Sequence, residues 1–178
     1  MPRFVVLLRG VNVGKGNRVL MADFRALLEA LGQTDVRTLL NSGNAAFTST
    51  SRSTTKLATD IAVGLQTRFD VTTPVIVKSA NEFRAIVDGN PITPPEADHS
   101  RFLVAFAMDP GRLAELGALE PLLHPGERLA VTEHAAYLHC AGGLLESRAG
   151  EALLGKAGKG ITTRNWATTL KLSAMLSV

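Results

Sequence analysis

The chain contains only one cysteine, one tryptophan and one tyrosine among its 178 residues, and it has no long hydrophobic run. A single cysteine, Cys140, excludes a disulfide within the chain, and the basic and apolar order of a secretory leader is missing, so we expect a cytoplasmic protein. The longest apolar stretch near the start, residues 4–8, is far too short to cross a bilayer, and we expect no membrane partner. With 46% hydrophobic residues, the chain is long enough to bury a core in one large domain or two small ones.

The formal charge of +3 is unevenly distributed along the chain. Residues 1–20 carry a charge of +4 without any acidic residue, residues 21–146 carry −5, and residues 147–178 carry +4. If the fold brings the two ends together, they form one basic surface on an acidic body, and an anion is the expected ligand. The alternative is two separate solvated basic stretches, and the charge pattern by itself favours neither.

The spacing of apolar residues in the first half predicts alternating strands and helices. A buried strand is predicted at residues 4–8, an amphipathic helix at 21–31 before Gly32, a hairpin of 36–40 with 45–48, a helix at 54–69 and a strand at 74–78. This β-α-β-β-α-β order is the split β-α-β arrangement of ferredoxin-like folds.

The second half repeats the pattern after a proline-rich linker at residues 91–100. The predicted elements are a helix ending at Asp88, a strand at 101–108, a short helix from Pro110, a hairpin of 128–132 with 135–140, a helix at 144–154 and a last helix starting near Thr163. The fold class we expect is α+β, with two ferredoxin-like units, residues 1–90 and 101–178, packed into one compact body.

A glycine-rich segment follows the first predicted strand and precedes the first helix, as a phosphate-binding loop would. The spacing of Gly10, Gly14, Lys15 and Gly16 matches neither the Walker loop nor the dinucleotide fingerprint, so neither a nucleoside triphosphatase nor a Rossmann enzyme is indicated. The glycines can serve simply to turn the chain. That interpretation does not explain the polar residues around them, which are Arg9, Asn12, Lys15 and Asn17.

The start of the last predicted helix is a second candidate anion site. Thr163 stands at the expected N-cap, with Arg164 and Asn165 in the first turn and Lys159 shortly before. A positive charge there is unfavourable to the helix, so either an acidic side chain or a bound phosphate or carboxylate must offset it. Trp166 lies on the apolar face of this helix, and we expect it in the core.

The remaining reactive residue types give no catalytic or metal signal. The four histidines lack the paired spacing of zinc ligands, and neighbouring His139 and Cys140 would point to opposite faces of a strand. Ser42 lies in the turn of the first hairpin without the surroundings of a nucleophile elbow. We therefore predict no metal and no cofactor, and catalytic residues are unknown.

Three unusual words occur in order along the chain: RGVNVG at the end of the first strand, SGN in the hairpin and TTRNW near the last helix. In order and spacing the sequence resembles the bacterial domain-of-unknown-function 1697 family over essentially its whole length. The resemblance implies an α+β fold with ferredoxin-like units and no established activity.

The leading functional hypothesis is the binding of an anionic, phosphate- or carboxylate-bearing ligand on a basic surface formed by the N- and C-terminal segments. The alternatives are a small cytoplasmic enzyme acting on a phosphorylated metabolite, and a nucleic-acid-binding module without sequence specificity. A closed concave site would favour the enzyme, and an exposed positive stripe would favour nucleic acid. The oligomeric state stays open. The predicted ligand-binding residues are Arg9, Asn12, Lys15, Asn17, Lys159, Thr163, Arg164 and Asn165.

Overall fold

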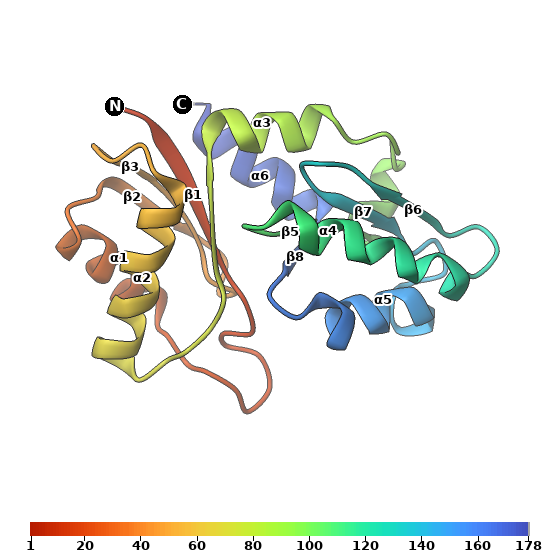
Figure 1. Ribbon diagram of the computed structural model, residues 1–178, viewed down its shortest axis with the longest axis horizontal. Helices are drawn as coiled ribbons and strands as arrows, with labels where there is room; N and C mark the ends of the chain where they lie inside the picture. Colours follow the sequence, from red (N-terminus) through yellow and green to blue (C-terminus); the bar gives the residue numbers. More distant parts are fainter. Residues whose placement is uncertain (178) are drawn as a thin grey trace. The chain divides into compact units, whose positions relative to one another are not determined.

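The computed structural model describes residues 1–177, which divide into two compact units (Figure 1). The first unit comprises Met1–Phe83 with Leu172–Val178, and the second comprises Arg84–Lys171. The boundary thus falls inside a helix, whereas the sequence suggested units of 1–90 and 101–178 separated by the proline-rich stretch. Within residues 1–177, no helix combines the length and the apolar character needed to cross a membrane.

The first unit is built around a four-stranded antiparallel sheet in the order β2-β3-β1-β4. Its elements are β1 (Arg3–Leu8), α1 (Met21–Ala30), β2 (Thr34–Leu39), β3 (Asn44–Thr48), α2 (Thr54–Phe69) and β4 (Val75–Ser79). The predicted β-α-β-β-α-β order is confirmed, while its ferredoxin-like name stays an interpretation. Strand β1 lies inside the sheet, and its apolar run Phe4–Leu8 is buried throughout, as a strand without a polar face requires.

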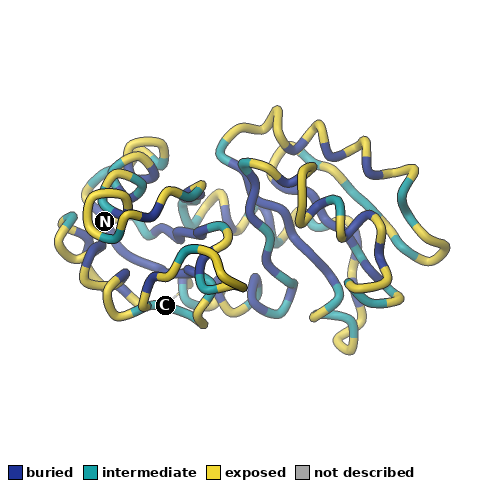
Figure 2. Tube along the Cα trace, turned by 90° about the horizontal axis from the view of Figure 1, so that it is seen from below, coloured by how far each residue is buried: buried dark blue, intermediate teal, exposed yellow. Residues whose placement is uncertain are grey.

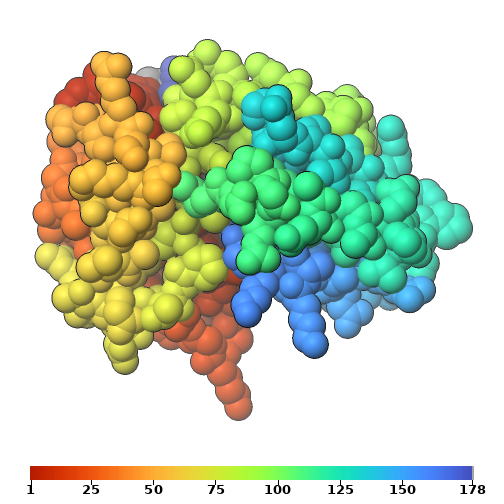
Figure 3. Space-filling model, in the orientation of Figure 1, coloured from red at the N-terminus to blue at the C-terminus, as the bar shows by residue number. Residues whose placement is uncertain are grey.

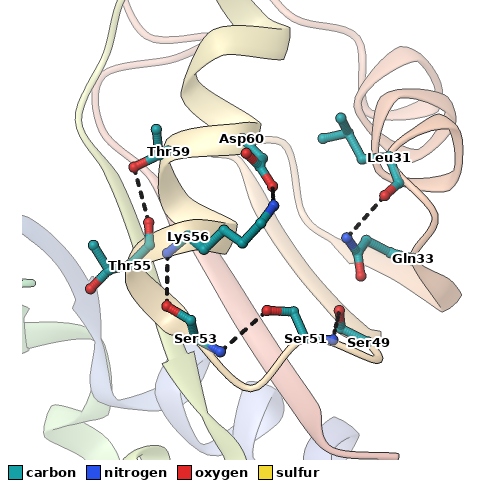
Figure 4. Close-up of polar contacts among 9 residues, drawn as sticks. All are labelled: Leu31, Gln33, Ser49, Ser51, Ser53, Thr55, Lys56, Thr59 and Asp60. Atoms are coloured by element: carbon teal, nitrogen blue, oxygen red, sulfur yellow. Dashed lines mark hydrogen bonds and ion pairs between the residues drawn. The ribbon is translucent and has the colours of Figure 1, made fainter.

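At the start of helix α2, serine hydroxyl groups accept hydrogen bonds from backbone N–H groups that have no partner within the helix (Figure 4). The Ser51 hydroxyl accepts a hydrogen bond from the Ser53 N–H at 3.2 Å, and the Ser53 hydroxyl accepts one from the Lys56 N–H at 3.1 Å, which makes Ser53 the N-cap. Nearby, the Gln33 side chain donates to the Leu31 carbonyl at 3.3 Å. Its Oε1 is buried without a hydrogen-bond partner in the described structure.

The second unit has the same sheet order with a new set of strands, β6-β7-β5-β8, again antiparallel throughout. Its strands are β5 (Phe102–Phe106), β6 (Arg128–Val131), β7 (Ala136–His139) and β8 (Thr162–Asn165). Its helices are α4 (Pro110–Ala114) and α5 (Arg148–Leu154), with 3-10 turns η1 (Glu96–Arg101), η2 (Glu115–Leu122), η3 (Leu144–Glu146) and η4 (Lys156–Gly158). Helices α3 (Ala80–Asp88) and α6 (Trp166–Leu176) are each divided between the units. The predicted repetition of the fold pattern is therefore confirmed at the level of strand order.

One predicted element is wrong. The last helix begins at Trp166, not near Thr163, and residues Thr162–Asn165 form strand β8 instead. The β-branched pair Thr162-Thr163 suits a strand, and β8 completes the sheet by pairing with β5, from Phe106 opposite Thr162 to Leu103 opposite Asn165. Tertiary pairing therefore decides the conformation of a segment that resembles a helix start in sequence.

The core of the second unit lies between its sheet and the helices of one face. Leu103, Ala105 and Leu138 from the strands pack with Leu113 and Leu153 from the helices. Trp166 is also buried, as expected, and its ring packs edge-to-face against the Phe102 ring, with the two ring centroids 5.7 Å apart. Strands β1, β3 and β5 are buried almost throughout, whereas β2 and β6 are largely exposed or half-buried. Buried and exposed stretches accordingly alternate along the chain (Figure 2).

Candidate anion-binding site

The connection between β1 and α1, residues 9–20, carries half of the predicted site residues. It leaves the end of β1 and extends away from the first unit before returning to α1 (Figure 1). The space-filling view shows this part of the chain, in orange-red, as a projection from the surface (Figure 3). We call residues 9–20 the basic loop.

Asn12 fixes the shape of the basic loop. Its backbone has a φ of +58°, a left-handed conformation that asparagine tolerates better than most residues. The side-chain Oδ1 accepts a hydrogen bond from the Val19 N–H at 3.0 Å, and Nδ2 donates to the carbonyls of Val19 at 2.7 Å and Asn41 at 2.8 Å. The polar atoms of Asn12 are thus engaged within the protein, which makes Asn12 a brace of the loop.

The two ends of the basic loop are tied to neighbouring segments. The Asn17 carbonyl accepts a hydrogen bond from the Asn12 N–H at 2.7 Å, and its Nδ2 donates to the Thr72 carbonyl at 3.4 Å. The Arg9 N–H donates to the Pro74 carbonyl at 3.3 Å, and the Arg9 carbonyl accepts from the Thr73 hydroxyl. The loop is therefore ordered by its own backbone and by contacts with residues 72–74.

The tip of the basic loop presents its cations to solvent. Lys15 and Arg18 are exposed, and Gly14 at the tip has a φ of +55°. The Arg18 guanidinium donates to the Gly14 carbonyl, which holds it against the tip. Arg18 was not among the predicted site residues, although its position in the acid-free first 20 residues was a sufficient signal to include it.

Arg164 has a different environment from the one its sequence position suggested. It lies in β8 opposite Val104, with only 8% of its surface exposed. Its Nη1 donates to the Thr162 hydroxyl and to the Thr163 carbonyl, both at 2.7 Å. Burial lowers the pKa of Arg164 to about 10, so the guanidinium still carries its charge at neutral pH.

Asn165, not Thr163, caps the last helix. The Asn165 Oδ1 accepts a hydrogen bond from the Thr168 N–H at 2.9 Å, and its carbonyl accepts one from the Thr169 hydroxyl at 2.9 Å. Thr163 is half-buried in β8, and Lys159 is exposed just after η4. Among the four predicted residues of this segment, Lys159 alone offers an exposed charge.

The structure therefore gathers the predicted residues into two groups. Arg9, Asn12, Lys15 and Asn17 share the basic loop of the first unit, and Lys159 through Asn165 belong to the second unit. That the two groups form one surface stays a prediction.

A further group of titratable side chains lies in the second unit, where Asp98, from the stretch predicted to be a linker, meets His139 of β7. His139 Nε2 lies 2.9 Å from Asp98 Oδ2, and Asp98 also pairs with Arg101. Burial, reinforced by the positive charges of Arg101 and Arg128, lowers the pKa of His139. The negative charge of Glu127 acts in the opposite direction but does not cancel these effects. The imidazole is therefore neutral at pH 7, and its Nε2–H donates to the Asp98 carboxylate.

The neighbouring Cys140 is buried, and burial raises the pKa of its thiol. Burial therefore shields the Cys140 side chain from solvent and also keeps it in the protonated, unreactive thiol form. In the described part of the chain, no three histidine, cysteine, aspartate or glutamate side chains are grouped so as to hold a metal ion.

The protein belongs to the mixed α/β class. Its distinguishing features are two units with the same strand order and an ordered, positively charged loop. The chain belongs to the family of proteins of unknown function DUF1697, whose model matches residues 1–137. Its structure is similar to that of a conserved bacterial protein from Streptococcus pneumoniae, with 26% sequence identity over 98% of each chain and a TM-score of 0.79. No curated protein matches the chain. These comparisons confirm the family resemblance and the mixed fold seen in the sequence.

Proposed function

We propose that this protein binds an anionic ligand, bearing phosphate or carboxylate groups, through the basic loop. The observation that carries the proposal is the exposure of Lys15 and Arg18 at the tip of a segment that holds no acidic residue. Because the segment has no acidic side chain to neutralise these two cations, their positive electrostatic potential can attract an incoming anion.

The order of the basic loop supports the same function. Because Asn12 already holds the loop through its side-chain hydrogen bonds to Val19 and Asn41, little conformational entropy is lost when an anion binds. An arginine fork and a lysine ammonium three residues apart offer both a directed and a point-charge contact to an oxyanion. The proposal rests on the first unit by itself, with Lys159 as a separate exposed cation of the second unit.

A binding function fits the loop better than catalysis. Residues 1–20 contain no histidine, aspartate, glutamate, cysteine, serine or threonine, so apart from the exposed Lys15 this stretch supplies neither a general base nor a nucleophile for the usual mechanisms. A chain whose single thiol, Cys140, is buried is well suited to a reducing cytoplasm.

Nucleic acid is the second candidate ligand, and the projection of the basic loop favours it. A projecting cationic loop can reach a continuous phosphate backbone, whereas an enclosed metabolite site needs concave walls. Lys15 and Arg18 would then contact phosphates without reading bases.

The test compares the affinity of two double variants for inorganic phosphate and for a single-stranded RNA of mixed sequence. Lys15→Ala with Arg18→Ala removes the loop cations, and Arg52→Ala with Lys56→Ala removes the same charges from exposed positions elsewhere in the first unit. We expect the loop variant to weaken binding roughly tenfold or more, as loss of a charge-assisted contact does, and the control variant to bind like the wild type.

Equal weakening by both variants would reduce the effect to net charge and overturn the proposal. The ligand is the polymer if three results coincide: the loop variant binds RNA more weakly, the wild-type protein does not bind phosphate, and the affinity for RNA falls steeply with salt concentration. Absence of binding to either probe would overturn both candidates.

A further inference from the structure

A second basic site lies at the β2 edge of the first unit, and it shares no lining residue with the basic loop. It is a cavity of about 500 Å³, within the size range of small-molecule sites. Three arginines from three different elements line it: Arg3 from β1, Arg25 from α1 and Arg37 from β2. We call it the arginine cavity.

Two of these arginines also hold the end of α6. Arg37 Nη2 donates to the Met175 carbonyl at 2.7 Å, and Arg3 Nη1 donates to the Leu176 carbonyl at 3.5 Å. Each contact uses one of the five N–H groups of a guanidinium, so both side chains keep donors for a second acceptor. The α6 contacts therefore orient these arginines without using up their binding capacity.

The charges in the cavity are not evenly compensated. Arg25 Nε pairs with Glu29 Oε1 at 3.0 Å, which neutralises that arginine locally. Asp35, the other carboxylate in the lining, accepts a hydrogen bond from the Thr48 hydroxyl at 3.4 Å. The three arginines outnumber the two carboxylates, and an incoming anion supplies the missing charge.

Strand β2 is distorted where it borders the cavity. The pairing of β2 with β3 shifts register between Thr34 and Arg37, and Asp35 within this bulge has a φ of +50°. A non-glycine residue in this conformation is strained, and bulges of this kind redirect side chains beside binding sites.

Apart from Thr48, the remaining lining residues are apolar. Met175 and Leu176 from α6 lie beside the guanidinium groups, and the half-buried Met175 offers more apolar surface than Val36 and Phe47, which are almost completely buried. Inorganic phosphate would fill only a small part of a cavity of this volume, so this apolar surface is available to an apolar group on the same ligand.

We propose that the arginine cavity binds a small molecule whose oxyanion head, a carboxylate or a phosphate, contacts Arg3 and Arg37. The apolar body of the ligand packs against Met175 and Leu176. This site is independent of the basic loop, and it differs from it in requiring an apolar body on the ligand.

The test uses the full isotope-labelled chain and three probes: inorganic phosphate, phenyl phosphate and benzoate. We expect phenyl phosphate or benzoate to shift the backbone amide signals of Val36, Phe47 and Thr48 saturably, with inorganic phosphate binding more weakly. Whichever organic probe binds more tightly identifies the head group as phosphate or carboxylate.

Variants then assign the contact. Arg37→Gln should raise the dissociation constant of the better probe roughly 10–100-fold, the range for loss of a hydrogen bond to a charged group. Arg52→Gln, at an exposed position outside the lining, and the Lys15→Ala with Arg18→Ala variant should bind the probe like the wild type.

Because Arg37 also holds Met175, the amide signals of Arg37→Gln away from the cavity must match those of the wild type. Arg3→Gln provides an independent second variant. The proposal is overturned if millimolar probe leaves the cavity amides of the wild type unmoved, or if the shifts map to residues 13–18 instead. It is also overturned if inorganic phosphate binds as tightly as phenyl phosphate, because the apolar surface then has no role.

Discussion

The side chain of Asn12 and the backbone of Val19 form a reciprocal pair of hydrogen bonds. Oδ1 of Asn12 accepts from the Val19 N–H at 3.0 Å while Nδ2 donates to the Val19 carbonyl at 2.7 Å. This pair closes the basic loop across seven residues, so the exposed cations between them stand on a fixed frame.

Replacing Asn12 by alanine should therefore loosen the loop that carries Lys15 and Arg18. The change removes the side-chain hydrogen bonds to Val19 and Asn41 and puts alanine in a left-handed conformation, so we expect a loss of about 2–4 kcal/mol in the free energy of unfolding. Urea denaturation measures this loss, and hydrogen exchange should show faster exchange of the Val19 amide. Asn17→Ala loses one long contact of 3.4 Å and is the control; equal effects of the two variants would contradict the bracing role of Asn12.

Gly43 in the β2–β3 hairpin should tolerate no side chain. Its φ is +85°, and a Cβ atom would lie 2.7 Å from the Leu8 Cβ, a contact that the central strand cannot relieve by turning a flexible group. Gly126→Ala is a matched control, because Gly126 has a φ of +89° with open space around it. We expect thermal or urea melts to show Gly43→Ala destabilised by about 1–3 kcal/mol more than Gly126→Ala, the cost of overpacking. Similar losses for the two would mean that backbone strain is the whole effect.

Arg164→Ala should lower stability without changing the response to anions. The guanidinium is buried in β8 and bonded to Thr162 and Thr163, so its removal leaves a cavity and broken hydrogen bonds worth about 2–5 kcal/mol. Arg148→Ala removes the same charge from an exposed position and should melt like the wild type. Melts with and without phosphate decide the role of Arg164: an unchanged melting temperature combined with loss of a phosphate effect would make it a ligand contact instead.

His139 should make the second unit less stable in mild acid. Because its folded pKa lies below the ordinary value of 6.5, the unfolded chain binds the proton more tightly, and stability falls as the pH drops below about 6.5 toward the folded pKa. Urea midpoints between pH 7.5 and 5 should show this slope in the wild type and a shallower one in His139→Gln. His134→Gln, at an exposed histidine, is the control; a midpoint that rises on acidification would show that Asp98 controls the titration.

Local patterns in the sequence predicted most of the fold. Helix α2 has the bounds expected from its apolar spacing, Thr54–Phe69, and the buried run of β1 is as predicted. Strand β8 was missed because Thr163-Arg164-Asn165 before an apolar face resembles a helix start, whereas pairing with β5 decides the conformation. Such pairing is a property of distant segments and leaves no local periodicity.

The candidate site was only partly accessible to sequence reasoning. The acid-free charge of residues 1–20 identified the basic loop, but nothing local indicated that the amide of Asn12 bonds within the loop or that Arg164 is buried. The arginine cavity was missed because Arg3, Arg25 and Arg37 are far apart in sequence, and each is an ordinary surface charge until the sheet and α1 assemble.

The most direct test of the central claim is the titration of the wild-type protein with inorganic phosphate, followed through its backbone amide signals. If the basic loop is the anion site, the signals of Gly14, Lys15 and Arg18 shift saturably, and the shifts disappear in the Lys15→Ala with Arg18→Ala variant. If these amides stay in place while phosphate moves signals elsewhere or nowhere, the basic loop is not a site for small anions.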